Sequence, residues 1–337
     1  MRTSAMFART PARKAMYESF YVRAVSPSEP VGVWIRHTAQ KRAGAAAVGS
    51  VWCTVFDAAR GRPFMAKLTS DSIREPSDGW VAIGDADGAG TAGGGTIGPA
   101  GTRGACGGAS WSLRDEPRTE PLQHLQRAWL YRAPLPRTKL TSPAPDARFD
   151  GSLRVSDQRE LDVENWRGMV GHNWGSEHAE RWIWLHGVGF AEDATAWLDV
   201  ALGRVIVGGR LTPWVANGAI SLDGRRVQIG GLTARGLRVA EGVEGCELRL
   251  PGEGGTTLEA HVAVPPGTAA GWRYDDPDGG AGHDVVNCSI ARLELSVTLG
   301  GGSATRTLTS AHGGAYELGM RERDHGVPIA QSAQEAG

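Results

Sequence analysis

The stretch GMVGHNWGSEHAERWIWLHG, at residues 168–187, decides the fold of this chain. It packs three Trp, three His and two Glu into one short segment. Apolar and polar residues alternate in its second half, so that Trp182, Trp184 and His186 share one face of an extended chain. This period of two predicts a β-strand. Gly171 and Gly175 flank the HNW triplet and predict a turn or bulge where the backbone approaches a neighbour closely.

The next apolar run, TAWLDVALG at 195–203, predicts the partner strand of a hairpin. A loop of even length centred near residues 192–193 places His186 opposite Asp199, and directly opposed residues share a face. A carboxylate beside an imidazole fixes the tautomer of the ring and raises its pKa. The hairpin therefore predicts a His186–Asp199 acid–base pair. The tryptophans expected on the same wall are Trp182, Trp184 and Trp197.

Short alternating runs bounded by Gly, Pro, Asp and Ser continue along the chain, and 48 Gly supply many turns. Helical periodicity over ten or more residues is scarce. These patterns predict an all-β protein made of antiparallel sandwiches or barrels. Candidate strands lie at 17–25, 31–42, 50–58, 181–190, 195–203, 204–213, 218–224, 225–232, 246–252, 257–265, 283–299 and 314–319.

A Pro-rich stretch at 131–151 lies between two parts of similar length. Proline favours extended backbone and cannot donate to a sheet, so this stretch predicts a connection. We therefore expect two β-domains, at 15–140 and 141–325. The residues before about Ala15 are expected to fray, and the Gly-rich segment 84–108 is expected to be a long flexible loop.

Composition limits the classes of function. The formal net charge of -1 argues against electrostatic capture of nucleic acid, and no apolar run approaches the ~20 residues that span a bilayer. Four widely spaced Cys and a basic N-terminus without an apolar core indicate a cytoplasmic protein with reduced thiols, and a peripheral contact with a membrane stays open. The 12 Trp favour a pocket for a hydrophobic small molecule, although each could simply fill a barrel interior.

Three interpretations of the HNW region compete. His172, Glu177 and His178 could hold a metal, but their spacing matches no HExxH-type motif. The same residues could form an acid–base site in an apolar pocket, or could only hydrogen-bond main chain and close the barrel. Nucleophilic catalysis is disfavoured, because no GxSxG elbow is present and no base is identified for a cysteine.

The segment HNWG followed by RWIWLHG resembles the tocopherol cyclase, carotenoid 1,2-hydratase and AttH-like family. The resemblance implies two lipocalin-like antiparallel β-barrel halves without a cofactor. It also implies chemistry on long isoprenoids, in which a double bond is protonated and water is added or a ring is closed. More distant lipocalin-like relatives catalyse pericyclic cyclisations. The match places His172, Asn173 and Trp174 on the family motif, and Trp182 and Trp184 on its aromatic strand.

One position departs from the family pattern. The hydratases and cyclases carry an acid just before the motif His, and this chain has Gly171. The acid must then come from Glu177, Asp199 or Glu18. Alternation puts Glu18 on the face of Phe20, towards a barrel interior, where it could be a pocket acid. The competing structural role is an ion pair with Arg36 or Lys41.

The sequence thus predicts a binder of an isoprenoid-like or polyketide-like molecule that acts as an acid-promoted cyclase, hydratase or isomerase. A non-catalytic carrier is the alternative, and a metal-dependent enzyme is the weaker one. The expected catalytic residues are His172, Glu177 and Asp199. The expected substrate-binding residues are Asn173, Trp174, Trp182, Trp184, His186, Trp197 and Glu18.

Overall fold

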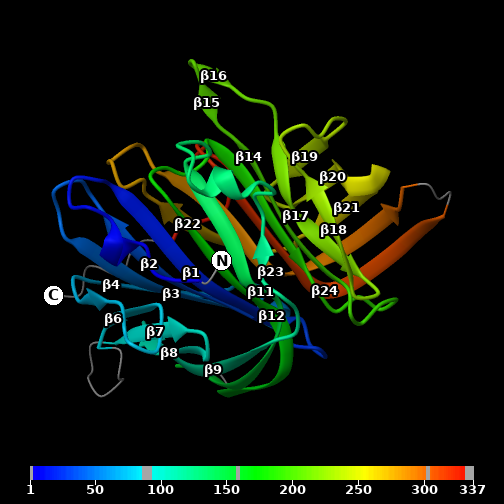
Figure 1. Cartoon of the computed structure of the whole chain (residues 1–337). Coiled ribbons are helices and arrows are strands. Elements are labelled where there is room, and N and C mark those ends of the chain that lie inside the picture. The colour runs from blue at the N-terminus through cyan, green and yellow to red at the C-terminus, as the bar shows by residue number, and fades with distance from the viewer. Residues whose placement is uncertain (1–2, 86–92, 157–159, 301–303, 331–337) are drawn as a thin grey trace.

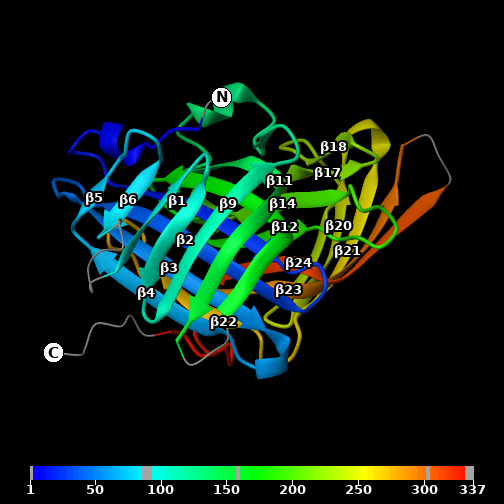
Figure 2. The same cartoon turned by 90° about the horizontal axis from the view of Figure 1, so that it is seen from below.

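The computed structural model describes residues 3–85, 93–156, 160–300 and 304–330, and within these ranges it contains strands and short 3₁₀ turns but no α-helix. Two antiparallel sheets lie side by side (Figures 1 and 2). One sheet holds 12 strands and the other 10. The predicted all-β fold with two antiparallel halves is confirmed.

The first sheet has the order β4-β3-β2-β1-β12-β11-β9-β8-β7-β6-β5, with β10 paired to β11. Its strands are β1 (Met16–Val25), β2 (Val31–Lys41), β3 (Ala47–Asp57), β4 (Phe64–Ser70), β5 (Ile73–Arg74), β6 (Val81–Gly84), β7 (Gly94–Gly98), β8 (Gly101–Cys106), β9 (Ala109–Pro117), β10 (Leu122–Gln123), β11 (Thr138–Val155) and β12 (Glu160–Gly175).

The second sheet has the order β18-β17-β14-β13-β24-β23-β21-β20-β19, with β22 paired to β23. Its strands are β13 (Arg181–Gly187), β14 (Trp197–Arg204), β17 (Val215–Leu222), β18 (Arg225–Gly230), β19 (Arg238–Gly242), β20 (Gly245–Pro251), β21 (Thr257–Ala263), β22 (Ala270–Tyr274), β23 (His283–Thr298) and β24 (Thr305–Met320). The 3₁₀ turns are η1 (Phe7–Arg9), η2 (Ala58–Arg60), η3 (Ala128–Tyr131) and η4 (Glu253–Gly255).

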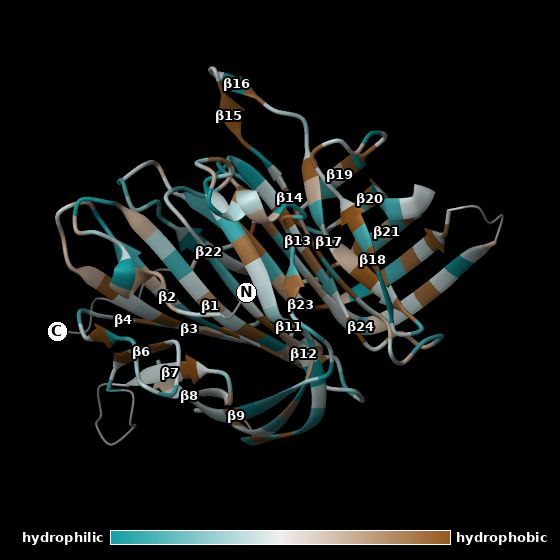
Figure 3. Cartoon of the chain, in the orientation of Figure 1, coloured by the Kyte–Doolittle hydropathy of each residue, from teal (hydrophilic) through white to brown (hydrophobic). Residues whose placement is uncertain are grey.

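Alternation along the strands gives the first sheet two apolar faces. Phe20 and Val22 of β1 pack into a core inside the first sheet, whereas Tyr21 packs into the core shared with the second sheet. The alternating colours along the strands of Figure 3 follow the same period. Side chains that are neighbours in sequence therefore pack into two different cores. Two polar residues can contact each other only when they face the same core.

Most of the Pro-rich stretch, from Thr138 onward, is strand, and the chain does not cross between the two sheets there. Residues 138–155 form β11, which pairs with both β12 and β9. Its register shifts between Thr141 and Ala144 and again between Ala144 and Ala147, so Pro143 and Pro145 lie in the irregular parts where a missing N–H is tolerated. The two sheets divide between Gly175 and Arg181, so the boundary expected at 140 falls inside a strand of the first sheet.

Two further segments are more ordered than expected. The Gly-rich segment contains strands β7 and β8, while its residues 86–92 lie outside the described part of the chain. A Cβ at Gly95 would lie 2.7 Å from His37 Nε2, so glycine leaves room for this buried imidazole. The N-terminal segment does not fray from residue 3 onward, because Ala5 and Phe7 are buried in the first core. The HNW triplet is likewise strand, within β12, and not a turn.

The small hairpin of β15 (Ile206–Val207) and β16 (Arg210–Leu211) projects from the body of the protein (Figure 1). Ile206, Val207 and Leu211 are among the exposed large apolar residues. The described residues include no helix that is long and apolar enough to cross a bilayer. The expected peripheral membrane contact stays a prediction, and this hairpin is the surface on which to test it.

His37 should make the fold sensitive to acid. It is fully buried, neither ring nitrogen has a hydrogen-bond partner within the described ranges, and burial lowers its pKa to about 3. The unfolded chain takes up a proton near pH 6.5, whereas the folded chain does so only near pH 3. The contribution of neutral His37 is therefore present above pH 6.5 and is lost as the pH falls below it.

We expect the free energy of unfolding to drop between pH 6 and 4, and the variant His37→Leu to lose about 1.4 kcal/mol less per pH unit in this window. Urea denaturation at several pH values measures both slopes. Equal slopes in the two proteins would contradict this assignment. His186, whose pKa burial also lowers, to about 4, remains in the variant and adds to both curves.

Candidate active site

A cavity of ≈ 270 Å³ lies at the end of the first sheet that the N-terminal segment covers. Its walls come from that segment, from the chain before and within β10, from β11 and from the end of β12. The lining residues are Thr3, Ser4, Met6, Glu120, Pro121, Leu122, Gln123, Thr141, Pro143, His172 and Trp174. The HNW motif thus supplies two adjacent same-face residues, His172 and Trp174, to this cavity.

The imidazole of His172 is held on both faces. Phe20 stacks on it with a centroid distance of 4.1 Å, and Trp174 stacks on it at 4.5 Å. The cause is register, because Phe20 is the direct β1 partner of His172, and Trp174 follows it two residues later on the same face. The ring therefore has a fixed plane, and its nitrogens have fixed directions.

Glu18 is the partner of His172. Its Oε1 lies 2.8 Å from His172 Nε2, and both side chains are buried. The backbone N–H groups of Met6 and Phe7 also donate to the carboxylate, at 2.8–2.9 Å. Neither of the two ion-pair partners expected from sequence is used. Arg36 lies on the opposite face of the sheet and donates to Ser19, and Lys41 donates to the carbonyl of Thr10.

These contacts determine which nitrogen of His172 can react. A carboxylate accepts hydrogen bonds, so Nε2 carries the proton and Nδ1 of the neutral ring has a free lone pair. Burial lowers the pKa of His172, and the hydrogen bond and charge of Glu18 offset this effect only in part. His172 is therefore a neutral base at pH 7, with Glu18 placed to stabilise its protonated form.

The packing of Tyr21 explains why this chain has glycine at position 171. A Cβ at position 171 would overlap the ring of Tyr21, which faces Gly171 directly across β1 and β12. An acid at this position would point into the space between the two sheets, away from the cavity. Gly171 is thus required by the packing of this chain.

Asp199 lies between the sheets in a separate polar network. The predicted register is confirmed, since His186 and Asp199 are direct partners across β13 and β14. The carboxylate accepts from His124 Nε2 at 3.1 Å, from Trp184 Nε1 at 3.1 Å and from the hydroxyl of Ser142. Burial alone would raise its pKa, but the charge and hydrogen bonds of His124 and Ser142 outweigh burial and lower it. Asp199 stays ionised and joins the two sheets.

Burial outweighs the rise that the charge of Asp199 causes in the pKa of His186. Burial is the largest effect, and together with the nearby Arg23 it lowers the pKa of His186 to about 4. The ring contacts Arg23 Nη1 at 3.3 Å and the carbonyl of Pro145 at 3.0 Å instead of the carboxylate. A neutral, fully buried imidazole with these partners supports packing between the sheets.

The other expected site residues lie apart from the cavity. Glu177 pairs with Arg137 near the surface. Trp182 donates to Glu317 at 2.8 Å, Trp197 is buried in the core shared by the sheets, and Asn173 lies on the face of β12 opposite His172. Of the expected set, the structure brings together Glu18, His172 and Trp174.

The metal interpretation of His172, Glu177 and His178 is not supported, because the three residues do not form one cluster. Each of the three has a different acidic or basic partner, namely Glu18, Arg137 and Asp276. Sequence reasoning also missed Met6, His124 and Ser142. The alternation of Thr141, Ser142 and Pro143 could have indicated that Ser142 points away from the face of its neighbours, but no sequence signal places His124 beside Asp199.

Comparisons with known proteins agree with this fold. No family model matches the chain. Two uncharacterized proteins of Mycobacterium tuberculosis, from strains CDC 1551 and H37Rv, are 28% identical over 213 residues. That match covers 63% of this chain and 61% of theirs, so it spans less than two thirds of the length of these relatives.

Three solved structures share the architecture. CghA, also solved with Sch210972, has a TM-score of 0.60 at 13% identity, over 91% of this chain and 88% of its own. An AttH-like protein from Nitrosomonas europaea has a TM-score of 0.51 at 12% identity, over 94% and 96%. Kievitone hydratase from Nectria haematococca has a TM-score of 0.51 at 11% identity, over 94% and 92%. The chain therefore has the two-sheet fold of AttH-like proteins.

Proposed function

We propose that this chain is an enzyme that hydrates, cyclises or isomerises a hydrophobic small molecule, with His172 as the proton-transferring residue and Glu18 as its positioning residue. The observation that carries this proposal is the buried Glu18–His172 pair at 2.8 Å on the wall of a cavity. The structural similarity of this chain to kievitone hydratase, and to CghA, which was solved with Sch210972, supports the same class of chemistry.

The proposed chemistry follows from the state of His172. The neutral ring accepts a proton at Nδ1 from a water or hydroxyl as its oxygen attacks a substrate double bond conjugated to a carbonyl, which takes up the electron pair, and Glu18 stabilises the imidazolium that forms. The imidazolium then returns the proton to a substrate carbon, so hydration adds one water overall. When the attacking oxygen belongs to the substrate, the same two proton transfers close a ring without a change in mass.

The cavity walls indicate the substrate class. Met6, Leu122 and Trp174 offer apolar contact area, while Thr141 and Gln123 supply hydrogen-bonding groups. A drug-sized ligand needs about 300–1,000 Å³, so this cavity holds one end of such a molecule. An isoprenoid-like or polyketide-like substrate with its reacting group at that end fits this arrangement.

The test uses the full chain with linear isoprenoids and polyenes that carry an α,β-unsaturated carbonyl group. We expect quenching of Trp fluorescence on binding, and a product that has either gained the mass of one water or has unchanged mass with a new chromatographic retention time. The variant His172→Gln should keep binding and lose about 100-fold or more in turnover. His261→Gln, which alters an exposed histidine on β21, is the control and should match the wild type.

Two outcomes would redirect the proposal. Binding of a probe without any conversion would favour the alternative, a non-catalytic carrier that uses the same cavity. Turnover by His172→Gln at the wild-type rate would show that His172 does not transfer the proton.

A further inference from the structure

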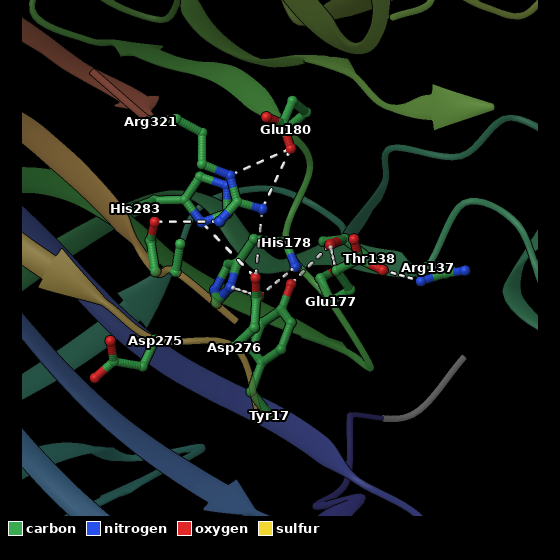
Figure 4. A network of polar contacts seen from close by, with 12 residues as sticks. Tyr17, Arg137, Thr138, Glu177, His178, Glu180, Asp275, Asp276, His283 and Arg321 are labelled. Carbon is green, nitrogen blue, oxygen red and sulfur yellow. Dashed lines mark hydrogen bonds and ion pairs between the residues drawn. The ribbon is translucent and has the colours of Figure 1, made fainter. Parts of the chain in front are cut away.

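A second group of polar residues lies where the chain crosses from one sheet to the other (Figure 4). His178 belongs to the crossover between β12 and β13, Asp276 follows β22, and His283 begins β23. One ligand atom of each residue lies within 4.8 Å of those of the other two. Strand pairing between β22 and β23 brings Asp276 and His283 together, since Tyr274 and His283 are direct partners.

Most of the ring nitrogens in this group are buried without a partner. Asp276 Oδ1 accepts from the backbone N–H of His178 at 2.9 Å and from its Nδ1 at 2.7 Å. Within the described residues, His178 Nε2 and both nitrogens of His283 are buried and none meets the geometry of a hydrogen bond, although the backbone carbonyl of Ala179 lies beside His283. His283 is fully buried, and unpartnered buried polar groups cost stability. A neutral imidazole has one lone pair, so each of the two rings can offer one nitrogen to a ligand that accepts lone pairs.

The second carboxylate oxygen of Asp276 also lies close to His283. Asp276 Oδ2 lies 3.9 Å from His283 Nδ1. Ligand atoms about 2.0–2.2 Å from a tetrahedral zinc ion lie about 3.3–3.6 Å from one another, so a small rotation of His283 brings this pair to coordinating distance. His178 Nδ1 already lies 2.7 Å from Asp276 Oδ1, so a bound ion would replace the hydrogen bond between them and take His178 Nδ1, an oxygen of Asp276 and His283 Nδ1 as ligands.

The surroundings hold His178 in place and balance the charges. Tyr17 stacks on the ring at 4.0 Å and Trp182 at 5.5 Å. Arg321 lies 3.9 Å from Asp276 Oδ2, which opposes a cation, but Glu180 binds the same guanidinium at 3.2 Å. The charged side chains here are Asp276, Glu180 and Glu317 against Arg36 and Arg321. Glu180 offsets the charge of Arg321, so the charges around the two neutral imidazoles are close to balance.

We propose that His178, Asp276 and His283 bind a divalent transition-metal ion of the zinc type. Two imidazoles and one carboxylate form a ligand set that suits zinc, which imposes little geometric preference of its own. The ion would tie the crossover segment to the loop between β22 and β23 and so stabilise the joint between the two sheets. This site lies outside the cavity of His172 and does not depend on the proposed enzymatic function.

The experiment uses the full chain after treatment with EDTA, titrated with zinc chloride by calorimetry and with cobalt chloride by visible absorption. We expect one ion per chain, cobalt bands of a four-coordinate site, and a higher Tm with zinc. His283→Gln should weaken the Kd at least tenfold and abolish the Tm increase. This variant should fold, because the His283 side chain makes no hydrogen bond within the described ranges.

Two controls make the result specific. His261→Gln removes an exposed histidine and His172→Gln removes the cavity histidine, and both should bind zinc like the wild type. Asp276→Asn provides a second ligand variant and should also weaken the Kd at least tenfold. Absence of saturable binding in the wild type, or equal affinity in wild type and His283→Gln, would overturn the proposal.

Discussion

Glu18→Ala should lower the free energy of unfolding by about 3–5 kcal/mol, because it leaves several buried donors without an acceptor. The carboxylate accepts from Met6, Phe7 and His172, and only this group anchors the N-terminal segment to β1 through side-chain hydrogen bonds within the described residues. Urea denaturation measures the loss. Hydrogen exchange should show faster exchange of the amides of Met6 and Phe7 in the variant.

The matched control is Glu116→Ala. Glu116 pairs with Arg148 on the surface, with 67% of its side chain exposed, and such pairs contribute at most about 1 kcal/mol. A Glu18→Ala protein within 1 kcal/mol of the control, with the amides of Met6 and Phe7 still protected, would show that the carboxylate does not hold this segment.

Gly171→Asp, which restores the residue type of the resembling family, should also be strongly destabilising. Overpacking of a core typically costs about 1–3 kcal/mol, and the Tyr21 ring leaves no room for a Cβ at this position. We expect a loss at the upper end of this range, because Tyr21 is itself packed edge-on against Trp184 at 5.5 Å. Thermal and urea unfolding measure the effect.

A double-mutant cycle separates this clash from the burial of a new charge. Gly171→Ala tests the Cβ alone, and Tyr21→Ala alone should cost about 3–5 kcal/mol through the lost ring. The double variant Tyr21→Ala/Gly171→Ala should be more stable than the sum predicts, by a coupling of about 1–3 kcal/mol. Additive losses would mean that the ring and the glycine do not constrain each other.

Local patterns predicted the parts of the fold that depend on neighbouring residues. The period of two and the even hairpin loop were sufficient to place His186 opposite Asp199, and alternation was sufficient to turn Glu18 towards the first core. These relations involve short separations along the chain. The structure confirms both.

Contacts between distant strands could not be predicted in the same way. Glu18 and His172 are separated by 154 positions, and they meet only because β1 pairs with β12. From sequence alone, the nearest candidates were Arg36 and Lys41 on the following strand. Similarly, no pattern showed that Asp276 and His283 would face His178 across the crossover.

Glycine and proline were misleading for a physical reason. Both are typical of loops, but β7, β8 and β11 contain them inside a sheet. In β7 a Cβ at Gly95 would crowd His37, and in β8 a Cβ at Gly104 would crowd the backbone of Gly94 and Gly95 and lie 2.9 Å from the Trp111 ring. These glycines therefore make room for the side chains and backbone of neighbouring strands, and the sequence alone does not show which strands lie close.

The packing of Tyr21 against Gly171 also has an evolutionary consequence. A chain with this fold can keep either a large ring at the position of Tyr21 or an acidic side chain at the position of Gly171, so the two positions should change together among homologues. Chains with glycine and tyrosine should keep a glutamate at the position of Glu18. Chains with an acid at the position of Gly171 should carry a small residue at the position of Tyr21. In those chains the residue at the position of Glu18 should vary more freely.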